Sequence, residues 1–175
     1  LLRARVLAAD PPAPLPLYAL PHALDAVLAL DGDMLTGGFV RHDFAAGDTV
    51  GIGPFDVRTW ALPHFVPNAG LRLTAGGRTL AYTGDTGPSE DIVALAADAD
   101  IFLAEATFPE HIADERDAHY LSTARQAGDH ARRAGVGALV LTHLWPGTGP
   151  AAALTAAAFP GRVDVAVSGL TVDVT

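Results

Sequence analysis

Residues Leu80–Pro88 read LAYTGDTGP and carry an apolar strand into a glycine-flanked turn and then toward a helix. The glycines on either side of Asp85 would let the backbone approach a site closely. A proline just after the turn suits the first turn of a helix. A carboxylate at the carboxyl end of a strand lies where open α/β sheets bind ligands. Two interpretations of Asp85 stay open, a turn or cap residue and a metal ligand.

Three more ionisable residues follow apolar strands in the same way. Glu105 follows the predicted strand Asp100–Ala104, His143 follows Ala138–Thr142, and His64 follows a strand that ends at Leu62. Imidazole nitrogen and carboxylate oxygen suit zinc or a similar metal, and one carboxylate can bridge two metals. The structural alternatives are a hydrogen-bonded core histidine for His143, a loop histidine for His64 and an arginine partner for Glu105.

The hydropathy pattern predicts one mixed α/β domain over residues 1–175. In its first third we expect a strand at Arg3–Ala9, an edge strand at Leu15–Leu20, a helix at His22–Leu30 and a loop at Asp31–Gly38. The later elements alternate between strands and helices, with Ser122 as an N-cap and Gly135 as a helix stop. They are expected at Phe55–Leu62, Leu71–Thr74, Thr79–Thr83, Pro88–Ala97, Asp100–Ala104, Ser122–Ala134, Ala138–Thr142, Ala151–Ala158, Val163–Val167 and Leu170–Val174.

Composition excludes several classes of protein. The chain has no cysteine, so disulfide frameworks and cysteine-based zinc sites are excluded. Its net charge is −9 and Arg132-Arg133 is its only adjacent basic pair, which disfavours RNA as a partner. No apolar run reaches the length of a bilayer span and no signal peptide is visible, so we expect a cytoplasmic protein with no membrane partner.

Four blocks in order resemble the C-terminal part of a metallo-β-lactamase-fold hydrolase of the ribonuclease Z-like branch. The resemblance implies an αββα sandwich in which Asp85 bridges two metals, His64 binds the first metal and His143 binds the second. The ligands of the family's His-x-His-x-Asp-His motif are not in this sequence, so we expect a domain that lacks its N-terminal strands. The four blocks are Leu80–Pro88, Asp100–Pro109, His119–Ala131 and Leu139–Pro146.

The same resemblance gives roles to two further residues. His119 precedes a Ser/Thr-initiated helix and is expected to protonate the leaving group, with Glu105 orienting it. Ala104 departs from the family pattern, which often has histidine before that glutamate, and this weakens a strict ribonuclease Z assignment. The other histidines are expected at the surface or in loops, and Trp145 is expected to pack or to line the substrate site. Those histidines are His22, His42, His111 and His130.

The resemblance implies a hydrolase that uses two divalent metals, zinc, manganese or iron, to activate water. A small phosphodiester or other ester is the expected substrate, and a homodimer stays open. The intervals from His64 to Asp85 and from Asp85 to Glu105 leave no room for the long tRNA-gripping arm of the processing enzymes. Two alternatives stay open: a lactonase or thioesterase-like enzyme on the same fold, and a degenerate binding module without catalysis.

Overall fold

A computed structural model describes residues 1–174 of the chain. The chain divides into two compact units, Leu1–Ala46 and a larger one that begins at Gly47. Every residue of the candidate site lies in the larger unit.

The first unit contains short helices and a two-stranded parallel sheet formed by β1 (Leu15–Ala19) and β2 (Phe39–Asp43). The edge strand predicted at Leu15–Leu20 is therefore confirmed. The strand predicted at Arg3–Ala9 is wrong, because α1 (Leu2–Val6) is helical. The apolar residues at its two ends are four positions apart, a helical spacing, and Val6 packs against Gly38. The other elements here are α2 (Asp25–Ala29), shorter than predicted, and a 3-10 turn η1 (Gly32–Leu35) inside the predicted loop.

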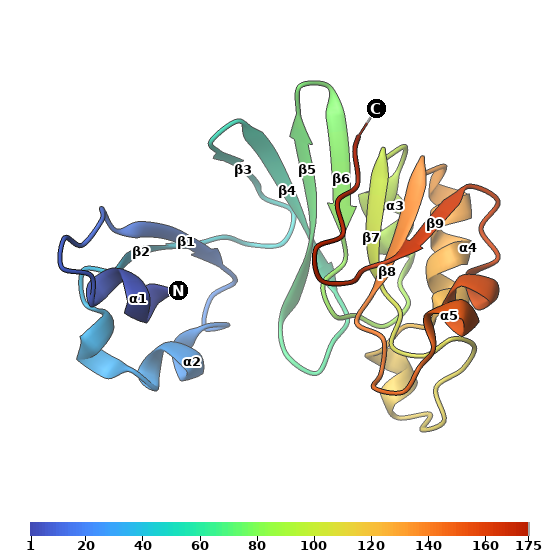
Figure 1. Ribbon diagram of the computed structural model, residues 1–175, viewed down its shortest axis with the longest axis horizontal. Helices are drawn as coiled ribbons and strands as arrows, with labels where there is room; N and C mark the ends of the chain where they lie inside the picture. The colour runs from blue at the N-terminus through green and yellow to red at the C-terminus, as the bar shows by residue number, and fades with distance from the viewer. Residues whose placement is uncertain (175) are drawn as a thin grey trace. The chain divides into compact units, whose positions relative to one another are not determined.

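The second unit is built on one seven-stranded sheet whose spatial order follows the sequence from β3 to β9. Its first four strands form an antiparallel meander, and the pairs from β6 to β9 are parallel (Figure 1). The central strands β7 and β8 are almost wholly buried, as their continuous apolar runs require. The strands are β3 (Thr49–Ile52), β4 (Phe55–Leu62), β5 (Asn68–Ala75), β6 (Arg78–Tyr82), β7 (Ile101–Glu105), β8 (Ala138–Thr142) and β9 (Arg162–Val165).

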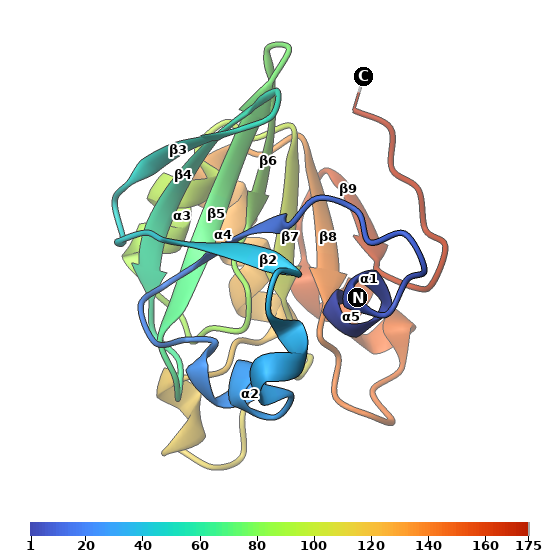
Figure 2. The same ribbon diagram turned by 90° about the vertical axis from the view of Figure 1, so that its left-hand side faces the viewer.

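Three helices connect the parallel strands: α3 (Glu90–Ala96), α4 (Ala124–Ala134) and α5 (Pro150–Ala157). Each crossover advances one strand in the same direction, and such crossovers are right-handed, so the helices share one face of the sheet (Figures 1 and 2). The core lies between that face and the helices and includes Phe102 and Leu139, both fully buried. This arrangement brings the carboxyl ends of β6, β7 and β8 to one edge.

Two details of the predicted elements are wrong. The N-cap of α4 is Thr123, whose hydroxyl accepts from the backbone N–H of Gln126, while the Gln126 side chain accepts in return from the N–H of Thr123. Ser122 instead donates its hydroxyl to the carbonyl of Thr86 (2.6 Å). No strand forms at Leu170–Val174. After β9 the chain turns through Gly169, at φ +81°, and then runs across the sheet without pairing with it, where Leu170 and Val172 lie against strands β7 and β8.

The histidines outside the site divide into two groups. His22, His42 and His111 are exposed, as predicted. His130 was expected at the surface, but it is only 7% exposed on α4, and this burial lowers its pKa. It lies two turns after Thr123 among apolar alanines. Because α4 is polar on average, the sequence alone does not indicate that this position is buried.

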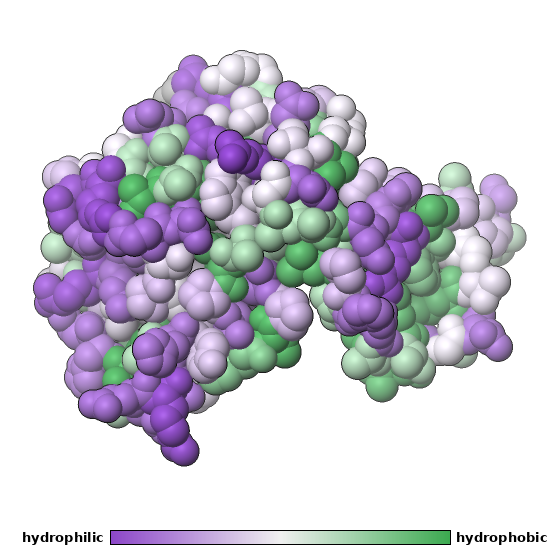
Figure 3. Space-filling view, turned by 180° about the vertical axis from the view of Figure 1, so that it is seen from behind, coloured by the Kyte–Doolittle hydropathy of each residue, from purple (hydrophilic) through white to green (hydrophobic). Residues whose placement is uncertain are grey.

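The surface of the larger unit carries both hydrophilic and hydrophobic side chains. Seen from behind, hydrophilic side chains separate small hydrophobic areas (Figure 3). Several of its arginines pair with nearby carboxylates, as Arg133 does with Glu90 and Arg125 does with Glu110. None of the helices within residues 1–174 is long and apolar enough to cross a membrane.

Candidate metal centre

The carboxyl ends of three neighbouring strands carry the predicted site residues to one edge of the sheet. Asp85 follows β6, Glu105 is the last residue of β7, and His143 follows β8. Backbone hydrogen bonds hold these ends in register, from Thr83 N–H to the carbonyl of Leu103 (3.2 Å) and from Ala106 N–H to that of Thr142 (2.9 Å). The prediction that these strand ends meet is therefore confirmed.

Asp85 and His143 face each other across this edge. The Oδ2 of Asp85 lies 3.5 Å from the Nε2 of His143, and both side chains are a little under half exposed. His143 adopts a left-handed backbone conformation, at φ +60°, which is uncommon for a residue with a side chain. Such conformations cluster at functional sites, where surrounding structure holds them.

The turn that presents Asp85 needs glycine. Gly84 has φ +63°, and a Cβ there would lie 2.6 Å from the side-chain oxygen of Asn68. Asn68 in turn donates from its amide nitrogen to the carbonyl of Thr83 (3.1 Å). Thus Asn68, the first residue of β5, supports the turn that follows β6 and helps to position Asp85.

Glu105 lies behind this pair and is only 1% exposed. Its Oε1 accepts from the N–H of Ser122 (3.2 Å) and from the hydroxyl of Thr107, and its Oε2 accepts from the N–H of Thr86. Burial raises the pKa of this carboxyl, and the three hydrogen bonds act in the opposite direction. The carboxylate therefore ties the Asp85 turn and the start of α4 to the end of β7.

His64 and His119 lie on segments that adjoin the Asp85 turn. The carbonyl of Pro63 accepts from the N–H of Gly87 (2.8 Å), and the Nδ1 of His64 lies 2.9 Å from the carbonyl of Tyr120. His119 ends the 3-10 turn η2 (Asp117–His119) and is exposed. Because Nδ1 of His64 has a carbonyl partner, its Nε2 is the nitrogen available to a ligand.

The structure does not assemble all of the predicted ligands. Within residues 1–174, no three His, Asp or Glu side chains lie close enough together to hold a metal ion. Asp85 and His143 are brought together, while His64 is directed to the carbonyl of Tyr120 and does not complete a set with them. None of the hydrogen bonds described above for Glu105 involves His119. The metal roles of the three residues and the catalytic roles of His119 and Glu105 stay predictions.

The donor chemistry at the pair nevertheless fits part of a metal site. A carboxylate oxygen and an imidazole nitrogen converge at a half-exposed edge, and the other imidazole nitrogen contacts Thr107 Oγ1 (3.0 Å). A catalytic zinc takes three protein ligands and keeps a position open. Asp85 and His143 thus supply two ligands of such a set.

Several residues at the site escaped the sequence analysis. Thr86, Thr107 and Ser122 complete the surroundings of Glu105, and the signal for them was their position next to strand-end residues. Trp145, which was expected to pack or to line the substrate site, is 56% exposed and stacks on Phe108 at 5.8 Å, so it lies at the surface and not in the core. Phe65, equally exposed, lies tilted against Tyr120, with ring centroids 4.7 Å apart.

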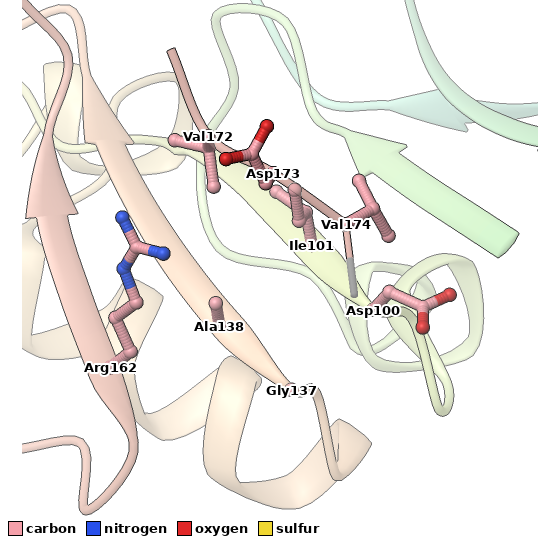
Figure 4. A pocket seen from close by; sticks show the side chains of 8 residues that line it. All are labelled: Asp100, Ile101, Gly137, Ala138, Arg162, Val172, Asp173 and Val174. Carbon is pink, nitrogen blue, oxygen red and sulfur yellow. The ribbon is translucent and has the colours of Figure 1, made fainter. Parts of the chain in front are cut away.

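A separate hollow of about 220 Å³ lies at the opposite edge of the sheet, where β7, β8 and β9 begin (Figure 4). Two of its charged residues, Asp100 and Arg162, already have partners. Asp100 accepts from the N–H of Thr79 (2.7 Å) and from Arg78 (3.0 Å), and Arg162 donates to Asp164 (2.7 Å). This hollow therefore differs from the carboxyl edge, where Asp85 and His143 do not have an arginine partner of this kind within residues 1–174.

Comparisons with known proteins agree with this geometry. Residues 3–144 match the family model described as the Beta-lactamase superfamily domain. The chain is 37% identical over 138 residues to an uncharacterised protein of Mycobacterium leprae, covering 77% of this chain and 48% of the relative. It is 41% identical over 98 residues to ribonuclease Z of Halobacterium salinarum, covering 54% and 32%. It is also 31% identical over 193 residues to ribonuclease Z of Mycobacterium bovis, covering 90% and 66%.

Solved structures show the same fold. The metallo-beta-lactamase fold protein YhfI from Bacillus subtilis aligns with TM-score 0.77 and 25% identity, over 89% of this chain and 64% of that one. The short form of human tRNase Z aligns with TM-score 0.70 and 21% identity, over 94% and 69%. A diphosphatase of the PhnP family aligns with TM-score 0.71 and 16% identity, over 93% and 59%.

This chain spans about half the length of the first curated relative that it matches. The family model covers most of the chain, and the strand-end residues lie where the sheet brings three carboxyl ends together. The chain therefore belongs to the beta-lactamase superfamily, among the ribonuclease Z-like proteins, and has the metallo-β-lactamase fold.

Proposed function

We propose that this protein is a metal-dependent phosphodiesterase in which two metals activate a water molecule. The observation that carries the proposal is the Asp85–His143 pair, a carboxylate and an imidazole 3.5 Å apart at the carboxyl edge. Both would be ligands, with Asp85 shared between the metals and His64 as a further ligand. The metals would be zinc, manganese or iron, the choices that suit nitrogen and oxygen donors.

When bound, such metals lower the pKa of a coordinated water toward neutrality and supply positive charge to the attacked phosphorus. The chain's own residues would hold the metals and orient the groups around them. Glu105 fixes the Asp85 turn through the N–H of Thr86, and the strained backbone of His143 directs its ring toward Asp85. His119, exposed beside this turn, would give a proton to the leaving-group oxygen.

A small phosphodiester suits this site better than RNA. The net charge of −9 does not attract a polyanion. The alignment with ribonuclease Z of Mycobacterium bovis spans 193 residues, more than the 175 of this chain, so that relative has residues with no counterpart here. The solved diphosphatase of the PhnP family shares this fold. A cytoplasmic location and a homodimer stay predictions.

The test is hydrolysis of bis(p-nitrophenyl) phosphate, run beside a panel of lactones, by the protein in its full length with added Zn²⁺. We expect the diester to be the faster substrate and Asp85→Asn and His143→Gln each to reduce the rate by at least about 100-fold, or roughly 2.7 kcal/mol. Asp100→Asn, at the other edge, is the matched control and should keep the rate. Faster lactone hydrolysis, or full activity in Asp85→Asn, would overturn the proposal.

A further inference from the structure

The side chain of Thr107 is fully buried between two residues of the site and has no part in the function proposed above. Its hydroxyl donates to Oε1 of Glu105 and lies 3.0 Å from Nδ1 of His143. The direct separation between that Oε1 and Nδ1 is 3.7 Å, too long for a hydrogen bond. Thr107 is therefore the bridge between the carboxylate and the imidazole.

Counting protons fixes the direction of both hydrogen bonds. A hydroxyl has one hydrogen to donate and two lone pairs. The oxygens of Glu105 already accept from Thr86 and Ser122 N–H groups, which suits an ionised carboxylate that only accepts, so the Thr107 hydrogen points to it. The hydroxyl can then offer only a lone pair to His143, and Nδ1 of His143 has to carry a hydrogen.

The consequence lies on the other side of the ring. A neutral imidazole with its hydrogen on Nδ1 has its lone pair on Nε2, the atom that faces Oδ2 of Asp85 at 3.5 Å. Two electron-pair donors facing each other at that distance form a site for a cation. A backbone hydrogen bond joins the two segments that carry the bridge, because the N–H of Trp145 donates to the carbonyl of Thr107 (2.9 Å).

We propose that Thr107 is a positioning residue that relays the Glu105 carboxylate to His143 and holds this histidine as the Nδ1–H tautomer, with Nε2 free to bind a divalent cation beside Asp85. The tautomer follows from contacts within the chain. Only its use, cation binding, rests on the proposed function. Histidine ligands are commonly oriented by a hydrogen bond at the other nitrogen, and losing that partner typically costs about 10–100-fold in metal affinity.

The first experiment measures the tautomer in the metal-free protein. Long-range ¹H–¹⁵N correlation spectra of the imidazoles are recorded at pH 8, and a His143→Gln variant identifies the signals of His143. We expect a protonated Nδ1 and an unprotonated Nε2. A His143 signal with the hydrogen on Nε2 in the unsubstituted protein overturns the proposal without any Thr107 variant.

The second experiment removes only the hydroxyl. Thr107→Val keeps the shape of the side chain, and Thr107→Ser keeps the hydroxyl, so the serine variant should retain the tautomer while the valine variant loses it. By calorimetric titration with Zn²⁺, Thr107→Val should bind about tenfold more weakly and Thr107→Ser about as the parent does. Thr155→Val is the matched control, because that hydroxyl bonds only to Ala151 in α5, away from the site.

The outcomes separate this proposal from the proposed function. If Thr107→Val keeps Nδ1 protonated and binds Zn²⁺ as the parent does, the bridge has no positioning role and the proposal fails. If the tautomer is as expected but the full-length protein hydrolyses no phosphodiester, the tautomer assignment stands and the proposed function fails.

Discussion

The two edges of the parallel sheet each carry an aspartate, and the two residues have opposite surroundings. At the amino edge, Asp100 accepts a hydrogen bond from the N–H of Thr79 and pairs with Arg78. These contacts, with the backbone hydrogen bond first, lower the pKa of its carboxyl. At the carboxyl edge, the ionisable neighbour of Asp85 is His143, at 3.5 Å.

This difference in hydrogen-bond partners indicates a structural role for the amino edge and a binding role for the carboxyl edge. A carboxylate whose lone pairs are occupied by an N–H group and a guanidinium stabilises the fold and has little left to offer a ligand. A half-exposed carboxylate beside one imidazole contributes little to folding and is free to bind. Natural proteins accept such locally unfavourable arrangements at functional sites, where stability is given up for activity.

The largest expected effect concerns close packing beside the carboxyl edge. A Cβ at Gly87 would lie 2.0 Å from the carbonyl oxygen of His119 and 2.8 Å from the N of Tyr120, both backbone atoms. We expect Gly87→Ala to lower the free energy of unfolding by about 3 kcal/mol, the upper end for overpacked sites. At the amino edge, Gly137→Ala meets only the carbonyl of Asp100, at 2.8 Å, and should cost about 1 kcal/mol.

Urea unfolding followed by circular dichroism measures these differences. The control is Gly51→Ala in β3, where an added Cβ meets nothing within 4 Å and the change should stay below about 0.5 kcal/mol. If Gly87→Ala is as stable as the control, the contact between the Asp85 turn and the His119 segment is not as tight as described.

The next effect concerns the buried carboxylate of Glu105. Glu105→Gln keeps the size of the side chain but turns one acceptor oxygen into an NH₂ group that faces a donor. Because the carboxylate accepts from three donors, we expect a loss of about 2 kcal/mol in the free energy of unfolding. A loss no greater than that of Asp100→Asn would mean that the donors around Glu105 are satisfied in other ways.

The smallest expected effect is a difference between Asp100 and Asp85 in how each contributes to the stability of the fold as the pH changes. The folded pKa of Asp100 is depressed, so its ionised form stabilises the fold above the unfolded pKa of about 4, and this contribution is lost as pH falls through the folded pKa. Asp100→Asn should therefore be less stable than the parent at pH 7, with the difference closing in acid. Asp85→Asn should match the parent in stability at pH 7.

Thermal unfolding from pH 7 down to pH 3 gives both comparisons in one series. Equal destabilisation by the two substitutions at neutral pH would remove the contrast between the edges, because it would show that Asp85 also contributes to folding.

Much of the larger unit could be predicted from its sequence. The strand at Ala138–Thr142 is confirmed at both ends, and the strands predicted at Leu71–Thr74 and Thr79–Thr83 are confirmed by the pairing of β5 with β6. Continuous apolar runs and glycine turns are local signals. The first unit was less predictable, because at α1 the same five residues suit a strand by alternation and a helix by spacing.

The site was predictable in its strand ends but not in its buried contacts. Asp85, Glu105 and His143 stand out because each polar residue follows an apolar run. Thr107 and Ser122 do not, because their roles depend on which backbone and side-chain groups the fold brings beside Glu105. The burial of His130 likewise depends on how α4 packs, and no local pattern indicates it.

The central claim, that the carboxyl edge holds a metal through Asp85 and His143, is tested most directly by calorimetric titration of the metal-free protein with Zn²⁺ at pH 7.5. The account predicts that Asp85→Asn weakens binding by at least about tenfold, while Asp100→Asn, the same substitution at the other edge, leaves the dissociation constant within about twofold of the parent. Unchanged binding by Asp85→Asn, or an equal loss in both variants, would contradict it.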